Sequence, residues 1–225
     1  MLKFIKHLGL IVLYFLASQV TSSFISLGIF KDQLAAELPA PIVEQAVWIS
    51  GIIGIVLTTI LAVVLWKVVY PRKTIAYTVE SSWFHKLHWP ILVYLVYFVI
   101  QFLIPVEESQ NQMIVVQFVS AYPILAFFSV VVFAPILEEL IFRGFLATYF
   151  FPKMQSMKTV GIYLIVSGLL FSLPHGPATI PQFLIYFTMG VNLGWIFLLK
   201  RDIRYSMALH FVNNLIAYGM ILVGV

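Results

Sequence analysis

Long apolar runs separated by short polar segments dominate the pattern along the chain. The runs lack the alternation of apolar and polar residues that is typical of barrel strands. A helix needs about 20 residues to cross a hydrocarbon core of about 30 Å, and the runs are long enough for this. The pattern therefore predicts an all-α, polytopic membrane helix bundle with about seven transmembrane helices. We expect these spans over Leu8–Phe30, Val43–Val69, Trp89–Ile104, Tyr122–Phe150, Thr159–Leu173, Pro181–Leu199 and Tyr205–Val223.

Composition supports the same class. Of the 225 residues, 62% are hydrophobic and 10% are charged, and the mean hydropathy is +1.02. A soluble domain averages about 45–50% apolar and about 25% charged residues. We expect a single membrane domain over residues 1–225, with the polar motifs described below in 121–225. The absence of cysteine excludes a thiol nucleophile, thiolate metal ligands and disulfides.

The basic residues predict the orientation, because Lys and Arg in short loops are retained on the cytoplasmic side. With seven spans and a cytoplasmic N-terminus, eleven of the thirteen basic residues fall on the cytoplasmic side. The C-terminus is then expected outside, and the net charge of +4 reports topology and not a nucleic-acid partner. The eleven are Lys3, Lys6, Lys67, Arg72, Lys73, Lys86, Lys153, Lys158, Lys200, Arg201 and Arg204.

The start of the chain permits an alternative. Lys3 and Lys6, the apolar stretch Leu8–Ala17 and the polar stretch Ser18–Ser23 could form a cleaved signal peptide. The apolar pattern resumes at Phe24–Phe30 without a good small-x-small cleavage site. We therefore expect a retained first span.

The fourth span carries three ionisable residues, Glu138, Glu139 and Arg143. Each charge near the centre of a membrane helix costs roughly 2.5–3.5 kcal/mol unless it is paired or meets internal water. Glu139 and Arg143 are spaced i, i+4 and can pair, whereas Glu138 lies about 100° around the helix. We expect Glu139 to be held by Arg143 and Glu138 to face a cavity. The alternative is a structural ion pair plus a carboxyl that packs against another helix.

Two later spans add further polar groups. His175 follows Pro174 at the end of the fifth span, and His210, Asn213 and Asn214 lie in the last span. Taken singly, an interfacial histidine or polar helix packing explains them. Two carboxyls, two imidazoles and an amide on three spans are, however, the groups needed to activate water and stabilise an oxyanion.

These residues form an ordered series of motifs. The series Glu138-Glu139-x-x-x-Arg143, Phe171-x-x-x-His175 and His210-x-x-x-Asn214 resembles the CPBP intramembrane protease family. That family, also called Abi, comprises CAAX type II prenyl endopeptidases and bacteriocin-processing or bacteriocin-immunity proteins. The resemblance covers Glu138 to Asn214, and the first half of the chain shows only generic hydrophobic spans.

The resemblance implies roles for the individual residues. Glu138 would be the general base acting on water, His175 would assist it, and His210 and Asn214 would orient or stabilise the oxyanion. Supporting positions would be Glu139, Arg143, Phe171 and Asn213. The name metalloprotease implies Zn²⁺, for which Glu138, His175 and His210 could supply three ligands and leave an open position. The glutamate-protease scheme needs no metal, and the sequence leaves both schemes open.

The implied partners are the lipid bilayer and a membrane-bound or lipid-modified peptide substrate, and the expected location is a bacterial plasma membrane. Two other functions are weighed against an intramembrane endopeptidase. One is a non-enzymatic immunity or regulatory protein that keeps the protease fold. The other is a proton-coupled transporter, which the lack of related halves disfavours.

The predicted depths of the polar groups are unequal. At 1.5 Å per residue from the cytoplasmic ends, Glu138 lies roughly 18 Å deep, His175 roughly 24 Å and His210 roughly 9 Å. Straight vertical helices would leave these groups apart. We expect helix tilts and breaks at Pro135 and Pro174 to bring them together.

Overall fold

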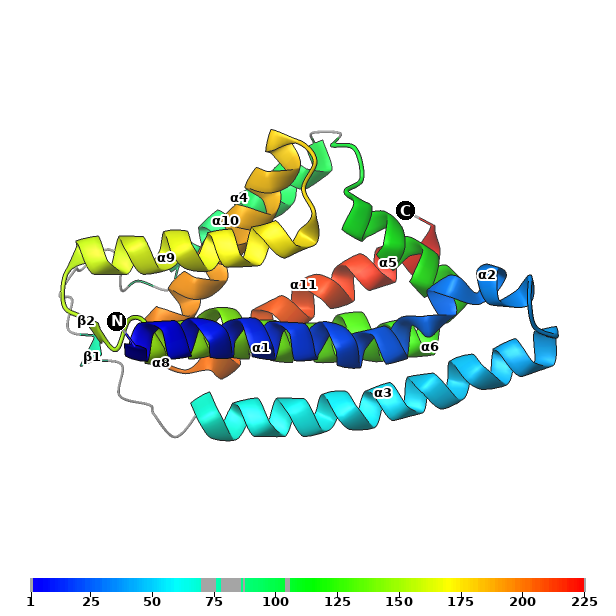
Figure 1. Cartoon of the computed structure of the whole chain (residues 1–225). Coiled ribbons are helices and arrows are strands. Elements are labelled where there is room, and N and C mark those ends of the chain that lie inside the picture. Colours follow the sequence, from blue (N-terminus) through cyan, green and yellow to red (C-terminus); the bar gives the residue numbers. More distant parts are fainter. Residues whose placement is uncertain (1, 70–75, 78–85, 87, 104–105, 225) are drawn as a thin grey trace. The chain divides into compact units, whose positions relative to one another are not determined.

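The computed structural model describes residues 2–69, 76–77, 86, 88–103 and 106–224, and these residues are mainly helical (Figure 1). The predicted end of the third span at Ile104 and the predicted cytoplasmic residues Arg72 and Lys73 lie outside the described residues. The helical elements in chain order are α1 (Leu2–Ile25), η1 (Ser26–Phe30), α2 (Lys31–Ala35), α3 (Ala40–Val69), α4 (His88–Leu103), α5 (Gln110–Ala121), α6 (Pro123–Ala126), η3 (Phe127–Phe133), α7 (Ala134–Glu139), η4 (Leu140–Phe145), α8 (Leu146–Tyr149), α9 (Met157–Ser172), η5 (Leu173–His175), α10 (Ile180–Lys200) and α11 (Ile203–Val223).

The all-α membrane class is confirmed. Within the described ranges, six helical segments are long and apolar enough to cross a membrane. A shorter apolar helix, His88–Val99, coincides with the third predicted span. The count of seven spans and the orientation of the termini stay predictions. The six longer segments are Leu2–Ala35, Ala40–Val69, Pro123–Tyr149, Met157–His175, Ile180–Lys200 and Ile203–Val223.

The chain divides into two compact units, which are described separately. The first comprises Met1–Lys67, Met113–Leu137 and Phe211–Val225. Its core gathers buried apolar side chains from four helical regions, namely Ile25, Val47, Phe118, Val119, Tyr122, Leu125, Ala126 and Phe133. Gly54 lets α3 approach α1 closely, because a Cβ there would lie 2.7 Å from the backbone nitrogen of Ile25.

The second unit comprises Val68–Gln112 and Glu138–His210. Helices α9 and α10 pack closely through glycines, since a Cβ on Gly190 would lie 2.9 Å from the Cα of Gly168. Tyr97 of α4 directs its hydroxyl at the sulfur of Met189 in α10, at 3.8 Å. A short parallel pair of strands, β1 (Ala76–Tyr77) and β2 (Lys153–Met154), also belongs to this unit.

The segment Pro123–Tyr149 departs twice from α-helical geometry. It widens into π-helix at η3 and again at η4. At the first of these, the N–H of Ala134 donates to the carbonyl of Ser129, five residues earlier. Pro135 follows directly and has no N–H to donate, so a helix irregularity near it has a physical cause.

The second π segment is supported by side chains from α9. Ser167 donates to the carbonyl of Phe142 at 3.3 Å, and the Tyr163 hydroxyl donates to that of Arg143 at 3.5 Å. These bonds satisfy carbonyls that a wider turn leaves less well paired. Since η4 immediately follows Glu139, the fold places an irregular helix beside the ionisable residues.

Candidate active site

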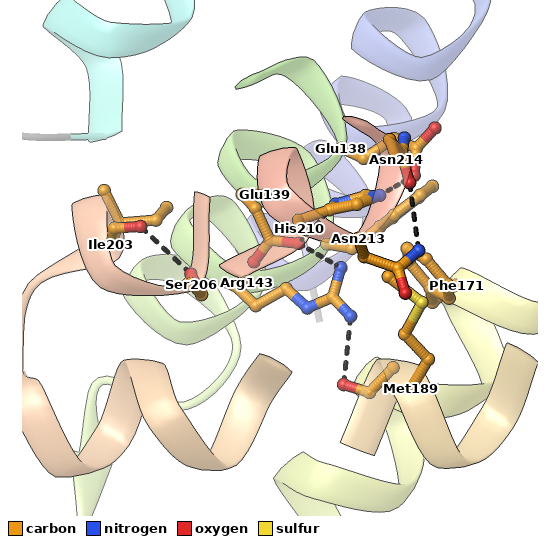
Figure 2. A network of polar contacts seen from close by, with 12 residues as sticks. Glu138, Glu139, Arg143, Phe171, Met189, Ile203, Ser206, His210, Asn213 and Asn214 are labelled. Atoms are coloured by element: carbon orange, nitrogen blue, oxygen red, sulfur yellow. Dashed lines mark hydrogen bonds and ion pairs between the residues drawn. The ribbon is translucent and has the colours of Figure 1, made fainter. Parts of the chain in front are cut away.

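The ion pair that the i, i+4 spacing predicted is present. Nη1 of Arg143 lies 2.8 Å from Oε1 of Glu139, and both side chains are completely buried. Nη2 of Arg143 donates to the carbonyl of Gly190 at 2.9 Å, which connects the pair to α10. A buried charge pair is tolerated only with such additional hydrogen bonds. Figure 2 shows this network, with the contacts of Glu139, Arg143 and His210 as dashed lines.

His210 of α11 lies between the two glutamates. Its Nδ1 is 3.1 Å from Oε1 of Glu139, and its Nε2 is 3.9 Å from Oε2 of Glu138. A carboxylate oxygen accepts hydrogen bonds, so the Nδ1 of His210 carries a hydrogen. The other ring nitrogen is thereby directed at Glu138.

The two glutamates differ in accessibility. The Glu139 side chain is fully buried, whereas 25% of the Glu138 side chain is exposed. Oε2 of Glu138 makes no hydrogen bond to the described residues. Oε2 is itself buried and lies 3.9 Å from Nε2 of His210, so a molecule entering the site would reach Glu138 at the exposed part of its side chain.

His175 terminates the η5 turn that extends α9. Its Nδ1 lies 2.6 Å from the carbonyl oxygen of Phe171, which can only accept. The hydrogen of a neutral His175 is therefore on Nδ1, and the lone pair is on Nε2. Pro174 restricts the backbone of this turn. Gly176 follows in the left-handed conformation, with φ +59°, and ends the turn.

The Phe171 ring contacts both imidazoles and the Arg143 guanidinium. Its centroid lies 4.7 Å from that of His175, 5.4 Å from that of His210 and 4.6 Å from Cζ of Arg143. Phe171 therefore packs against three of the polar residues, and its supporting role at the site stays a prediction. The two imidazoles thus meet the same ring, although the depth calculation placed their residues far apart.

Asn213 and Asn214 belong to the first unit. The Asn214 side chain donates to the carbonyl of Val130 at 2.9 Å, and Asn213 Nδ2 donates to Oδ1 of Asn214 at 3.2 Å. Asn214 is four residues beyond His210 on the continuous helix α11. Its role at the oxyanion and the supporting role of Asn213 stay predictions.

The fit to a metal can be tested on the side chains present. Over the part of the chain that the structure describes, no three His, Asp or Glu residues are grouped so as to hold a metal ion. Glu138, His175 and His210 therefore do not form a ready three-ligand set in this arrangement. The zinc site stays a prediction, and no step below is derived through a metal.

Tyr186 is a site neighbour that the sequence did not indicate. Its ring stacks on His175 with centroids 4.4 Å apart and an interplanar angle of 27°. Its hydroxyl lies 2.7 Å from Oγ of Ser109. One tyrosine in an apolar span resembles ordinary helix packing, so no pattern in the sequence could have revealed this contact.

Comparison with known proteins agrees with these motifs. Residues 120–216 match the family model of type II CAAX prenyl endopeptidase Rce1-like proteins. No curated protein and no solved structure matches the chain. The matched range contains Glu138, Glu139, Arg143, Phe171, His175, His210 and Asn214. The segment from residue 120 to residue 216 is therefore similar to the type II CAAX prenyl endopeptidase Rce1-like family.

Proposed function

We propose that this protein is an intramembrane endopeptidase in which Glu138 activates water for hydrolysis of a peptide bond. The observation that carries the proposal is the pairing of a partly exposed Glu138 with Nε2 of His210, at 3.9 Å, beside a buried Glu139–Arg143 pair. Carboxylates and imidazoles in such positions perform general acid–base chemistry. The family match of residues 120–216 supports the same reaction class.

The reaction begins when Glu138 accepts a proton from water. The water oxygen forms a bond to the carbonyl carbon of the substrate, and the carbonyl π electrons move onto oxygen to give a tetrahedral oxyanion. Glu138 then returns its proton to the amide nitrogen as the C–N bond breaks. The products are a carboxylic acid and an amine, so one water is consumed for each bond cleaved. The Nε2 lone pair of His175 would accept a hydrogen bond from the other O–H of the attacking water and so orient it.

His210 is proposed to stabilise the oxyanion. A protonated His210 keeps one N–H on Glu139 and presents the other toward the site. The Asn214 amide is proposed as a second donor on the family resemblance.

The substrate is proposed to be a membrane-associated or lipid-modified peptide. Glu138, His175 and His210 all lie within helical segments long and apolar enough to cross a bilayer. A scissile bond that reaches them must therefore enter the membrane or its edge. We further propose a bacterial plasma membrane as the location.

Comparative membrane proteomics would identify the substrate. Cells expressing wild-type protein would be compared with cells expressing Glu138→Gln, with Glu37→Gln as the matched control because Glu37 is an exposed glutamate. We expect at least one membrane peptide to accumulate uncleaved with Glu138→Gln alone. A non-enzymatic immunity or regulatory protein would instead leave all peptides unchanged and keep its biological effect after joint replacement of Glu138 and His175.

A further inference from the structure

The orientation of His175 is fixed by more than its hydrogen bond. The bond from Nδ1 to the Phe171 carbonyl, at 2.6 Å, anchors one corner of the ring. A single hydrogen bond leaves the ring free to swing about its anchor. The stacked Tyr186 ring, 4.4 Å away, supplies a flat surface that limits this motion.

Tyr186 is itself held from outside α10. Its hydroxyl lies 2.7 Å from Oγ of Ser109, which also accepts the backbone N–H of Gln112 at 3.2 Å. Ser109 is 5% exposed and immediately precedes α5. The hydrogen bond thus fixes the far edge of the Tyr186 ring to a segment more than seventy residues away in sequence.

A second contact ties the same segment to α10 one turn earlier. Gln182 Nε2 donates to the carbonyl of Glu107 at 2.9 Å, and its Oε1 accepts the N–H of Ala178 at 2.7 Å. Ala178 lies in the loop that leads away from His175. The residues before α5 are therefore joined both to the Tyr186 ring and to the connection that follows His175.

We infer that Tyr186 is a positioning residue for His175, and that it acts through the stack of the two rings. The inference rests on the proposed function, because it deepens the role of His175 beside Glu138. The Phe171 carbonyl determines which nitrogen carries the hydrogen, and the Tyr186 stack determines the ring plane. Together they aim Nε2 of His175 in one direction. A misplacement of about 1 Å in such a group can reduce turnover about 100-fold.

The test combines nuclear magnetic resonance with kinetics. Full-length protein containing ¹⁵N-histidine would be placed in lipid nanodiscs, and the His175 signals assigned with His175→Asn. We expect a single Nδ1–H form of His175 in the wild type. Tyr186→Leu should broaden or average the ring signals of His175. It should also lower kcat about 10- to 100-fold, with KM changed less than about 3-fold. Leu184→Ala, an exposed position on α10, is the control.

Tyr186→Phe is the control for a folding defect in Tyr186→Leu, because it keeps the stack on His175 and removes only the hydrogen bond to Ser109. We expect it to restore most of the kcat lost in Tyr186→Leu and to keep the Nδ1–H signal. Unchanged His175 signals in Tyr186→Leu would overturn the inference, as would equal kcat losses for the leucine and phenylalanine variants. Failure of the proposed function would appear separately, as wild-type turnover by Glu138→Gln.

Discussion

His210 and Arg143 share one oxygen atom of Glu139. Nδ1 of His210 lies 3.1 Å from Oε1 of Glu139, and Nη1 of Arg143 lies 2.8 Å from the same oxygen. Glu139 thereby connects a pair on one helical segment with an imidazole on another. Groups in one network respond to substitution together and not additively. Substitution of Glu139 should therefore lower the stability of the fold more than substitution of Glu138. Substitution of Glu138 should lower the rate of cleavage more than substitution of Glu139.

The first prediction compares the two glutamates. Glu139→Gln leaves the buried Arg143 without its counter-charge, so the free energy of unfolding should fall by about 3–5 kcal/mol. Glu138→Gln removes a partly exposed carboxylate and should change it by less than about 1 kcal/mol. Thermal unfolding in detergent micelles measures both. Equal loss of stability in the two variants would contradict a structural role for Glu139 and a chemical role for Glu138.

The second prediction concerns the shape of Arg143. Its two terminal nitrogens donate to Glu139 and Gly190, and its guanidinium lies over the Phe171 ring. Lysine keeps the charge but cannot reproduce the planar fork. Arg143→Lys should lower the free energy of unfolding by about 1–3 kcal/mol. Lys200→Arg, made at the end of α10, is the reciprocal control and should be neutral.

The third prediction separates the two nitrogens of His175. His175→Asn keeps an N–H near the position of Nδ1, so the bond to the Phe171 carbonyl can persist while Nε2 is lost. Stability should change little, and kcat should fall about 10²- to 10⁴-fold if Nε2 assists the base. Thermal unfolding and single-turnover cleavage report these effects. A folded His175→Asn protein with wild-type turnover would exclude His175 from the chemistry.

The fourth prediction tests the glycine contact beneath the site. A Cβ on Gly190 would lie 2.9 Å from both the Gly168 Cα and the Phe171 Cβ, so α9 and α10 would have to separate. Gly190→Ala should lower the free energy of unfolding by about 1–3 kcal/mol and reduce turnover. Gly161→Ala is the matched control, because a Cβ there meets nothing within 4 Å. Similar destabilisation of both variants would contradict the close packing.

The positions of the membrane helices could be predicted because a span has a fixed length and composition. The predicted stretch Val43–Val69 differs from α3 by three residues at its start and ends at the same residue. Helix α5 was missed, since its twelve residues include three glutamines, an asparagine and a serine and do not form an apolar run. The strand pair β1–β2 has two residues on each side, too few to give a pattern.

The site was only partly predictable for a similar reason. The Glu139–Arg143 pair follows from spacing along one helix, whereas the contact between Glu139 and His210 joins residues 71 positions apart. Depths calculated for straight helices placed Glu138 and His210 roughly 9 Å apart. Nε2 of His210 and Oε2 of Glu138 nevertheless approach to 3.9 Å, because side-chain reach and irregular helices alter the simple geometry.

Cleavage by purified protein tests the central claim most directly. Wild-type protein, Glu138→Gln and Glu37→Gln would be reconstituted in proteoliposomes with the peptide that accumulates in Glu138→Gln cells. In H₂¹⁸O, mass spectrometry should find one ¹⁸O in the new carboxyl group with wild type and Glu37→Gln. We predict that Glu138→Gln, folded to the same extent, loses at least about 100-fold in turnover. Wild-type turnover by folded Glu138→Gln would contradict the account.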